Sequence, residues 1–139
     1  MIVIGIAGGS GAGKTTFVSA LRHALAEKGK TLSVIEQDLY YYDQGHLAME
    51  ERLRVNYDEP ASIEFTLISQ HVQDLREGRS VEIPIYDVLS MTRSGETTML
   101  DPSDVLVVEG ILVLCDESLC AQLDLSVRSE EHTSELQSR

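Results

Sequence analysis

The chain has 139 residues and a mass of 15.4 kDa, which suits one domain with its own buried core. Its formal net charge of −12, with no run of Lys and Arg, argues against a nucleic-acid partner. No apolar stretch approaches the roughly 18 residues of a membrane span, and the apolar start lacks the basic segment of a signal peptide. We therefore expect no membrane partner.

Apolar runs and glycines predict alternating strands and helices along the first half of the chain. Residues 2–7 are a short apolar run ended by glycines, which is typical of a central parallel strand. A helix is expected over residues 14–28, ending at Gly29, with Phe17, Val18, Leu21 and Leu25 at helical spacing. Residues 31–36 resemble a second strand. The polar segment 44–60 has at most a short helix, near residues 48–53.

The second half continues this alternation. We expect a helix opened by Ser62 and ended by Gly78, short edge strands at 81–86 and 97–101, a fully buried strand at 104–110 that extends toward Leu114, a short helix at 117–123 and a strand at 124–127. This order predicts an α/β fold with a mostly parallel sheet. Ligands of such sheets bind beyond the carboxyl ends of the strands.

The two cysteines, Cys115 and Cys120, are too few for a disulfide framework or a closed zinc site. Because both lie in an apolar stretch, we expect buried free thiols, which favours a cytoplasmic location.

A glycine-rich loop follows the first strand and precedes the first helix. Its sequence, GGSGAGKT, fits the phosphate-binding pattern G-x-x-x-x-G-K-[ST]. Backbone N–H groups of such a loop form an anion nest, the lysine contacts the β- and γ-phosphates, and the hydroxyl after it ligates magnesium. The expected nucleotide-binding residues are Gly8, Gly9, Ser10, Gly11, Ala12, Gly13, Lys14, Thr15 and Thr16. The alternative is a glycine-rich turn that binds nothing.

The loop does not identify the phosphate acceptor. The N-K-x-D base reader of GTPases and the L-S-G-G-Q signature of transporter ATPases are both absent, which favours a small-molecule kinase. Asp38 follows the second strand, where a carboxylate can orient an acceptor hydroxyl and take its proton. Glu109 closes the buried strand and is a candidate magnesium ligand. The alternatives are a cap for Asp38 and an ordinary hydrogen-bond partner for Glu109.

Tyrosines cluster in the irregular segments near the strand ends. Four of them, Tyr40, Tyr41, Tyr57 and Tyr86, are candidates to line a site for a planar substrate. Each alone could instead be a core or rim aromatic.

Six motifs together resemble the uridine kinase (uridine–cytidine kinase) family of phosphoribulokinase-like P-loop kinases. They are GIAGGSGAGKTT, EQDLYY, NYDEP, EIPIYD, TRSGET and DVLVVEGIL, in the family's order and spacing. The resemblance covers residues 4–127 and implies a three-layer α/β/α P-loop fold with a small β-hairpin substrate subdomain. It also implies transfer of phosphate from ATP or GTP, with Mg²⁺, to the ribose 5′-hydroxyl of uridine or cytidine. A homotetramer is the implied assembly.

The resemblance also assigns roles to residues. Asp38 matches the catalytic base, Lys14 the catalytic lysine of the loop, and Thr15 with Glu109 the magnesium site. The residues that match nucleoside-contacting positions are Tyr41, Tyr57, Asp58, Tyr86 and Arg93, with Asp58 gripping the ribose hydroxyls.

One departure from the family concerns the reading of the base. After the Tyr-Asp pair at 86–87, the family usually carries an aromatic residue and then a histidine that reads the pyrimidine edge. This chain has Val88 and Met91 there. Because methionine donates no hydrogen bond, this change weakens discrimination of the base. Two alternatives stay open: a related kinase for another hydroxyl compound, such as a sugar phosphate or pantothenate, and a module that binds ATP without transferring phosphate.

The last twelve residues, 128–139, show neither alternation nor helical periodicity. They resemble the in-frame translation of a short-read sequencing adapter, so we expect a native kinase domain at 1–127 that is truncated before the family's arginine-bearing lid and its C-terminal helices. The alternative is a genuine polar tail. As written, the chain is expected to be unstable and inactive.

Overall fold

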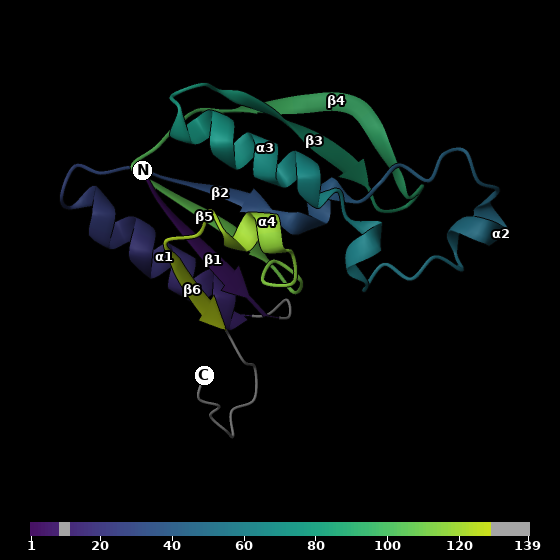
Figure 1. Ribbon diagram of the computed structural model, residues 1–139, viewed down its shortest axis with the longest axis horizontal. Helices are drawn as coiled ribbons and strands as arrows, with labels where there is room; N and C mark the ends of the chain where they lie inside the picture. The colour runs from purple at the N-terminus through teal and green to yellow at the C-terminus, as the bar shows by residue number, and fades with distance from the viewer. Residues whose placement is uncertain (9–11, 129–139) are drawn as a thin grey trace, which may run out of the picture.

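The computed structural model describes residues 1–8 and 12–128, without the side chains of residues 12–14. Its centre is a parallel four-stranded sheet with the order β2-β5-β1-β6 (Figure 1). The strands are β1 (Ile2–Ala7), β2 (Leu32–Glu36), β5 (Val105–Gly110) and β6 (Leu125–Arg128). The central strands β1 and β5 are apolar on both faces, as a parallel sheet covered on both sides requires.

Helices cover both faces of this sheet, which makes three layers. Alternate residues of β5 point to opposite sides: Val105 and Val107 pack with helix α1 (Ala12–Ala26), whereas Leu106 and Val108 face helix α3 (Phe65–Arg76). The short helix α4 (Glu117–Cys120) contributes buried Leu119 to the same side as α3. The predicted three-layer α/β/α architecture is confirmed.

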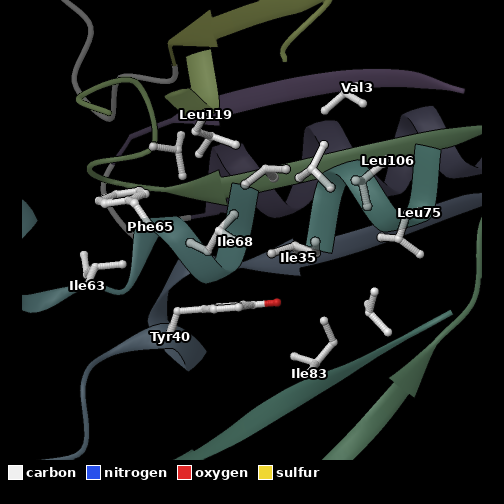
Figure 2. Packing of buried hydrophobic residues seen from close by; sticks show 14 of the residues in the cluster. Val3, Ile35, Tyr40, Ile63, Phe65, Ile68, Leu75, Ile83, Leu106 and Leu119 are labelled. Carbon is white, nitrogen blue, oxygen red and sulfur yellow. The ribbon is translucent and has the colours of Figure 1, made fainter. Parts of the chain in front are cut away.

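A separate antiparallel hairpin forms the small subdomain, from β3 (Val81–Asp87) and β4 (Thr92–Leu100). Its inner side joins the core through Tyr40, which ends the 3₁₀ turn η1 (Gln37–Tyr40) after β2. Figure 2 shows the Tyr40 ring between Ile68 of α3 and Ile83 of β3. The Tyr40 hydroxyl and Nδ1 of buried His71 lie 2.7 Å apart. The packing of Tyr40 and its hydrogen bond with His71 hold the hairpin against the main domain.

Three expectations about the elements need correction. Ser62 does not open a helix: it ends the 3₁₀ turn η2 (Pro60–Ser62), and its hydroxyl bonds the Asn56 carbonyl oxygen at 2.6 Å. The strand predicted at 97–101 is longer, spanning Thr92–Leu100, and it pairs with β3 in the expected hairpin. The buried strand ends at Gly110, because residues 111–114 form a turn.

The remaining elements follow the predictions with small shifts. The short helix α2 spans Met49–Arg52, and β6 includes Arg128, one residue beyond the expected boundary. Residues 129–139 lie outside the described residues, so the expected non-native tail stays a prediction. Both cysteines are free, but Cys115 is exposed and Cys120 is half-buried, so the expectation of two buried thiols is wrong. None of the helices in the described part of the chain has the length and apolar character needed to cross a bilayer.

Gly110 lets η1 approach the end of β5, which gives a prediction about stability. A Cβ at Gly110 would run into the Cβ, Cδ and Oε1 atoms of Gln37. Gln37 is fully buried and accepts a hydrogen bond from the Leu112 N–H at 2.8 Å, so it cannot move away without loss. Gly110→Ala should therefore lower the free energy of unfolding by about 1–3 kcal/mol more than a control with positive φ but free space around it.

Gly29→Ala is that control, because Gly29 has a φ of 71° and no neighbouring atom within 4 Å of its added Cβ. Urea unfolding of both variants measures the difference. Equal losses would contradict the close approach of Gln37 to Gly110.

Candidate active site

The carboxyl ends of β2, β5 and β1 meet at one edge of the sheet (Figure 1). In the strand ladders, Glu109 of β5 is level with Ile6 of β1 and with Glu36 of β2. Gly8 directly after β1, Glu109 of β5 and the turn η1 after β2 therefore lie at this edge. The convergence expected from the order of elements is confirmed.

The residues of the phosphate-loop motif extend in the chain from the end of β1 into the first turn of α1. Gly8 is half-buried directly after β1, whereas residues 9–11 lie outside the described residues. Helix α1 begins at Ala12, so Gly13 and Lys14 belong to its first turn, and the Thr15 and Thr16 side chains are exposed. The free N–H groups and positive dipole end of a 15-residue helix favour an anion here.

Asp38 lies in η1, with an exposed side chain beside the edge of the sheet. The adjacent Gln37 side chain is fully buried, and its bond to the Leu112 N–H ties η1 to the turn after β5. The N-cap of η1 is Glu36, which makes no side-chain capping hydrogen bond, and Asp38 lies within the turn itself. Its carboxylate is thus presented to solvent by a rigidly anchored turn.

Three tyrosines from three distant segments come together beside η1. The Tyr41 ring lies 5.3 Å from the Tyr57 ring, almost perpendicular to it at 89°, and 5.3 Å from the Tyr86 ring at 50°. They line an open cavity of about 370 Å³ whose walls are Tyr41, Leu53, Tyr57, Tyr86, Val88 and Met91. The expected clustering of Tyr41, Tyr57 and Tyr86 is therefore present, and its size suits a small planar molecule. Tyr40, the fourth candidate, is a core residue.

Two carboxylates lie close to this cavity. Burial raises the pKa of the Tyr41 hydroxyl, and the negative charges of Asp38 and Asp58 raise it further. Asp58 is exposed, and its N–H donates a hydrogen bond to Oδ1 of Asn56 at 2.9 Å. Tyr41 thus has the proposed base and the proposed ribose-gripping carboxylate as electrostatic neighbours.

Met91 is built into the cavity wall in an unusual conformation. Its φ of 58° falls in the left-handed region, which side chains other than glycine, asparagine, aspartate and histidine seldom adopt. The Tyr57 hydroxyl donates a hydrogen bond to Sδ of Met91 at 3.1 Å. Val88 lines the same cavity and is highly exposed. The two departures from the family pattern therefore face one cavity.

Arg93 holds the main chain of the segment that carries Tyr41. Its guanidinium donates hydrogen bonds to the carbonyl oxygens of Tyr41 at 3.1 Å and Tyr40 at 3.3 Å. It also pairs with the Glu64 carboxylate at 2.8 Å. These partners occupy Arg93 with the segment that carries Tyr41, so the geometry assigns it to holding that segment.

The chemistry of the available donors fits a magnesium ion that arrives with a nucleotide. Mg²⁺ usually binds through one or two carboxylates together with substrate phosphates. Thr15 offers a hydroxyl in the first turns of α1, and Glu109 is a half-buried carboxylate at the same edge. Among the described residues, no cluster of three or more His, Cys, Asp or Glu side chains forms a self-sufficient metal site.

The sequence did not reveal Gln37, Leu53 and Glu64 as parts of the site. Gln37 accepts a hydrogen bond from a main-chain N–H group, and Glu64 pairs with Arg93, which is distant in the sequence. Neither kind of contact leaves a local sequence pattern. The only available signal was Gly110, whose missing side chain marks the close approach of Gln37.

A glycine-rich G-x-x-x-x-G-K-[ST] motif between a central parallel strand and a helix, with carboxylates at the neighbouring strand ends, is the arrangement of a P-loop fold. Residues 3–133 match the Phosphoribulokinase / Uridine kinase family. The chain belongs to this family.

Individual relatives agree with this assignment. A uridine kinase of Bacillus cereus (strain AH187) is 46% identical over 126 residues, which cover 91% of this chain and 58% of that protein. A solved structure described as a possible uridine kinase from Bacillus stearothermophilus superposes with a TM-score of 0.66 and 26% identity, over 91% of this chain and 69% of the other. A putative fructose transport system kinase from Silicibacter sp. TM1040 gives a TM-score of 0.72 at 22% identity, over 91% and 64%, and shows the fold alone. The chain thus spans a little over half the length of the curated relative.

Proposed function

We propose that this chain carries the donor and acceptor sites of a uridine–cytidine kinase, which transfers phosphate from ATP or GTP to the ribose 5′-hydroxyl. The observation that carries the proposal is the tyrosine-lined cavity beside Asp38. The cavity can hold a pyrimidine, while Asp58 binds the ribose hydroxyls and Asp38 receives the 5′-hydroxyl. The curated relatives named uridine kinase support the same acceptor.

The residues divide the transfer between them. The loop from Gly8 to Thr16 binds the phosphates, with Lys14 as its positive charge. Thr15 and Glu109 would hold Mg²⁺, which neutralises charge on the β- and γ-phosphates when bound. Asp38 orients the acceptor hydroxyl and takes its proton as the new O–P bond forms and the bond to the leaving ADP breaks.

The wider context is part of the same proposal. The products would be UMP and CMP, which places the protein in cytoplasmic pyrimidine salvage. A homotetramer is the proposed assembly of the full-length protein. Arg93 serves this function by keeping Tyr41 in the cavity wall.

A second candidate is a related kinase that acts on another small hydroxyl compound. Val88 and Met91 favour it, because the apolar wall they form offers no donor to a pyrimidine edge. A putative fructose transport system kinase has the same fold.

An acceptor screen with radiolabelled ATP and the full-length protein tests the proposal. Uridine and cytidine should be the best acceptors in a panel that also contains purine nucleosides, sugar phosphates and pantothenate. Transfer to a non-nucleoside acceptor alone would establish the second candidate. ATP binding without transfer to any acceptor would indicate a non-catalytic module.

Met91→His tests whether the cavity reads the base. Histidine tolerates the left-handed backbone of this position better than most residues, so the variant should keep the hairpin intact. It restores a hydrogen-bonding side chain to the cavity wall, and should raise the preference for uridine over a purine or non-nucleoside acceptor by more than about threefold in the ratio of kcat/KM values.

Leu89→His is the matched control, because Leu89 is 85% exposed in the same turn and does not line the cavity. It should leave the ratio unchanged. A shift below threefold in the Met91 variant would place Met91 outside the base-binding part of the cavity.

A further inference from the structure

The side chain of Arg52, at the end of α2, donates hydrogen bonds to four main-chain carbonyl oxygens. Its half-buried guanidinium donates from Nε to the oxygens of Gln44 and Leu47, each at 2.9 Å. Nη1 donates to the Ser90 oxygen at 2.8 Å, and Nη2 to the Gly45 oxygen at 3.2 Å. One side chain thus joins the loop of residues 44–47 to the turn of the β3–β4 hairpin.

Further bonds join the same segments around the cavity. The Gln44 N–H donates to the Met91 carbonyl oxygen at 3.2 Å. The Tyr57 hydroxyl contacts the Arg52 carbonyl oxygen and Sδ of Met91, each at 3.1 Å. The hairpin turn is therefore attached at two consecutive carbonyl groups: that of Ser90, bonded by Arg52, and that of Met91, bonded by the Gln44 N–H.

This attachment matters because Met91 has a strained backbone. A left-handed φ in a methionine persists only when its surroundings hold it. The Arg52–Ser90 bond restrains the peptide just before Met91, and the Gln44 bond restrains the one just after it. Release of either would let the turn relax and carry the Met91 side chain out of the cavity wall.

We propose that Arg52 is a positioning residue that sets the shape of the acceptor cavity, an inference that rests on the function proposed above. Of the six residues that line the cavity, Val88 and Met91 lie in the hairpin turn that Arg52 holds, and Leu53 directly follows Arg52 in the chain. Because its donors point to main-chain oxygens, Arg52 acts through these walls and does not contact the phosphates. Lysine can replace it only in part, since a single ammonium group cannot span four carbonyl oxygens as the planar guanidinium does.

The inference predicts an effect on the acceptor alone. In the full-length protein, Arg52→Ala should raise the KM for uridine by about tenfold and leave the KM for ATP within about twofold, because misplaced walls affect only the acceptor. Arg52→Lys should recover part of the loss. Arg54→Ala is the control: Arg54 is exposed two residues away, and its side chain makes no hydrogen bond or ion pair with a described residue.

Amide hydrogen exchange gives a reading that needs no acceptor. The Gln44 amide, which bonds the Met91 oxygen across the two segments, should exchange at least about tenfold faster in Arg52→Ala and normally in Arg54→Ala. Unchanged exchange at Gln44 would overturn the inference, whatever the acceptor is. An unchanged uridine KM, or an equal rise in both KM values, would overturn it too. If the unaltered protein phosphorylates no acceptor, the proposed function fails and the exchange result alone decides the role of Arg52.

Discussion

Replacing Lys14 with alanine is expected to abolish tight binding of ATP with magnesium. The backbone nest of the phosphate loop supplies oriented N–H dipoles, but Lys14 is its only full positive charge. The protein carries a net charge of −12, so this local charge also offsets an unfavourable background field. Isothermal calorimetry with ATP and magnesium measures the loss directly.

Lys28→Ala is the matched control for this variant. Lys28 is exposed just beyond the opposite end of α1, so its removal changes the net charge equally and leaves the loop alone. It should bind ATP normally. Unchanged affinity in Lys14→Ala would contradict the role of the loop as the phosphate site.

Asp38→Asn is expected to bind ATP normally but to lose about two to four powers of ten in the rate of transfer, as the loss of a general base does. Asparagine keeps the shape and the position in η1, which Gln37 anchors. It cannot take the proton of the acceptor hydroxyl. Single-turnover transfer to uridine separates this step from binding and product release.

Glu36→Gln serves as its control. Glu36 is exposed at the end of β2, level with Glu109, and its substitution removes one negative charge from the same edge. A rate within about threefold of the unaltered protein is expected, because removing a screened, exposed charge is worth well under 1 kcal/mol. Near-normal turnover in Asp38→Asn would remove Asp38 from the mechanism.

The fold was predictable from the sequence in those elements whose burial requires an apolar or glycine residue at nearly every position. β1 and β5 are apolar on both faces, so both could be recognised as buried strands. Glycines follow β1 and α1, so the bounds of these two elements could be placed closely. β4 was predicted too short, because most of its residues are exposed and polar and Gly95 interrupts the pattern. The start of α3 was misplaced, since Ser62 resembles a cap but bonds Asn56 instead.

The residues of the candidate site were likewise predictable only in part. Asp38, Glu109 and the phosphate loop could be placed together, because parallel topology alone brings strand ends to one edge. The grouping of Tyr41, Tyr57 and Tyr86 followed from composition and resemblance. Arg52 and Gln37 could not be found, because their partners are carbonyl and N–H groups that every sequence possesses.

Val88 and Met91 give the cavity an apolar wall at the positions where the family usually carries a polar reader of the base. Shape and stacking on tyrosines can select a planar base, but they distinguish bases weakly without a polar reader. Broad acceptance of pyrimidine nucleosides is the expected consequence.

The central claim is that phosphate reaches the 5′-hydroxyl of a pyrimidine nucleoside. The most direct measurement is to incubate the full-length protein with ATP, magnesium and uridine, and to identify the product by mass spectrometry and ³¹P NMR. The proposed function predicts UMP with its phosphate on the 5′-oxygen and one ADP formed for each UMP. Hydrolysis of ATP with uridine left unmodified, or phosphate on another hydroxyl, would contradict it.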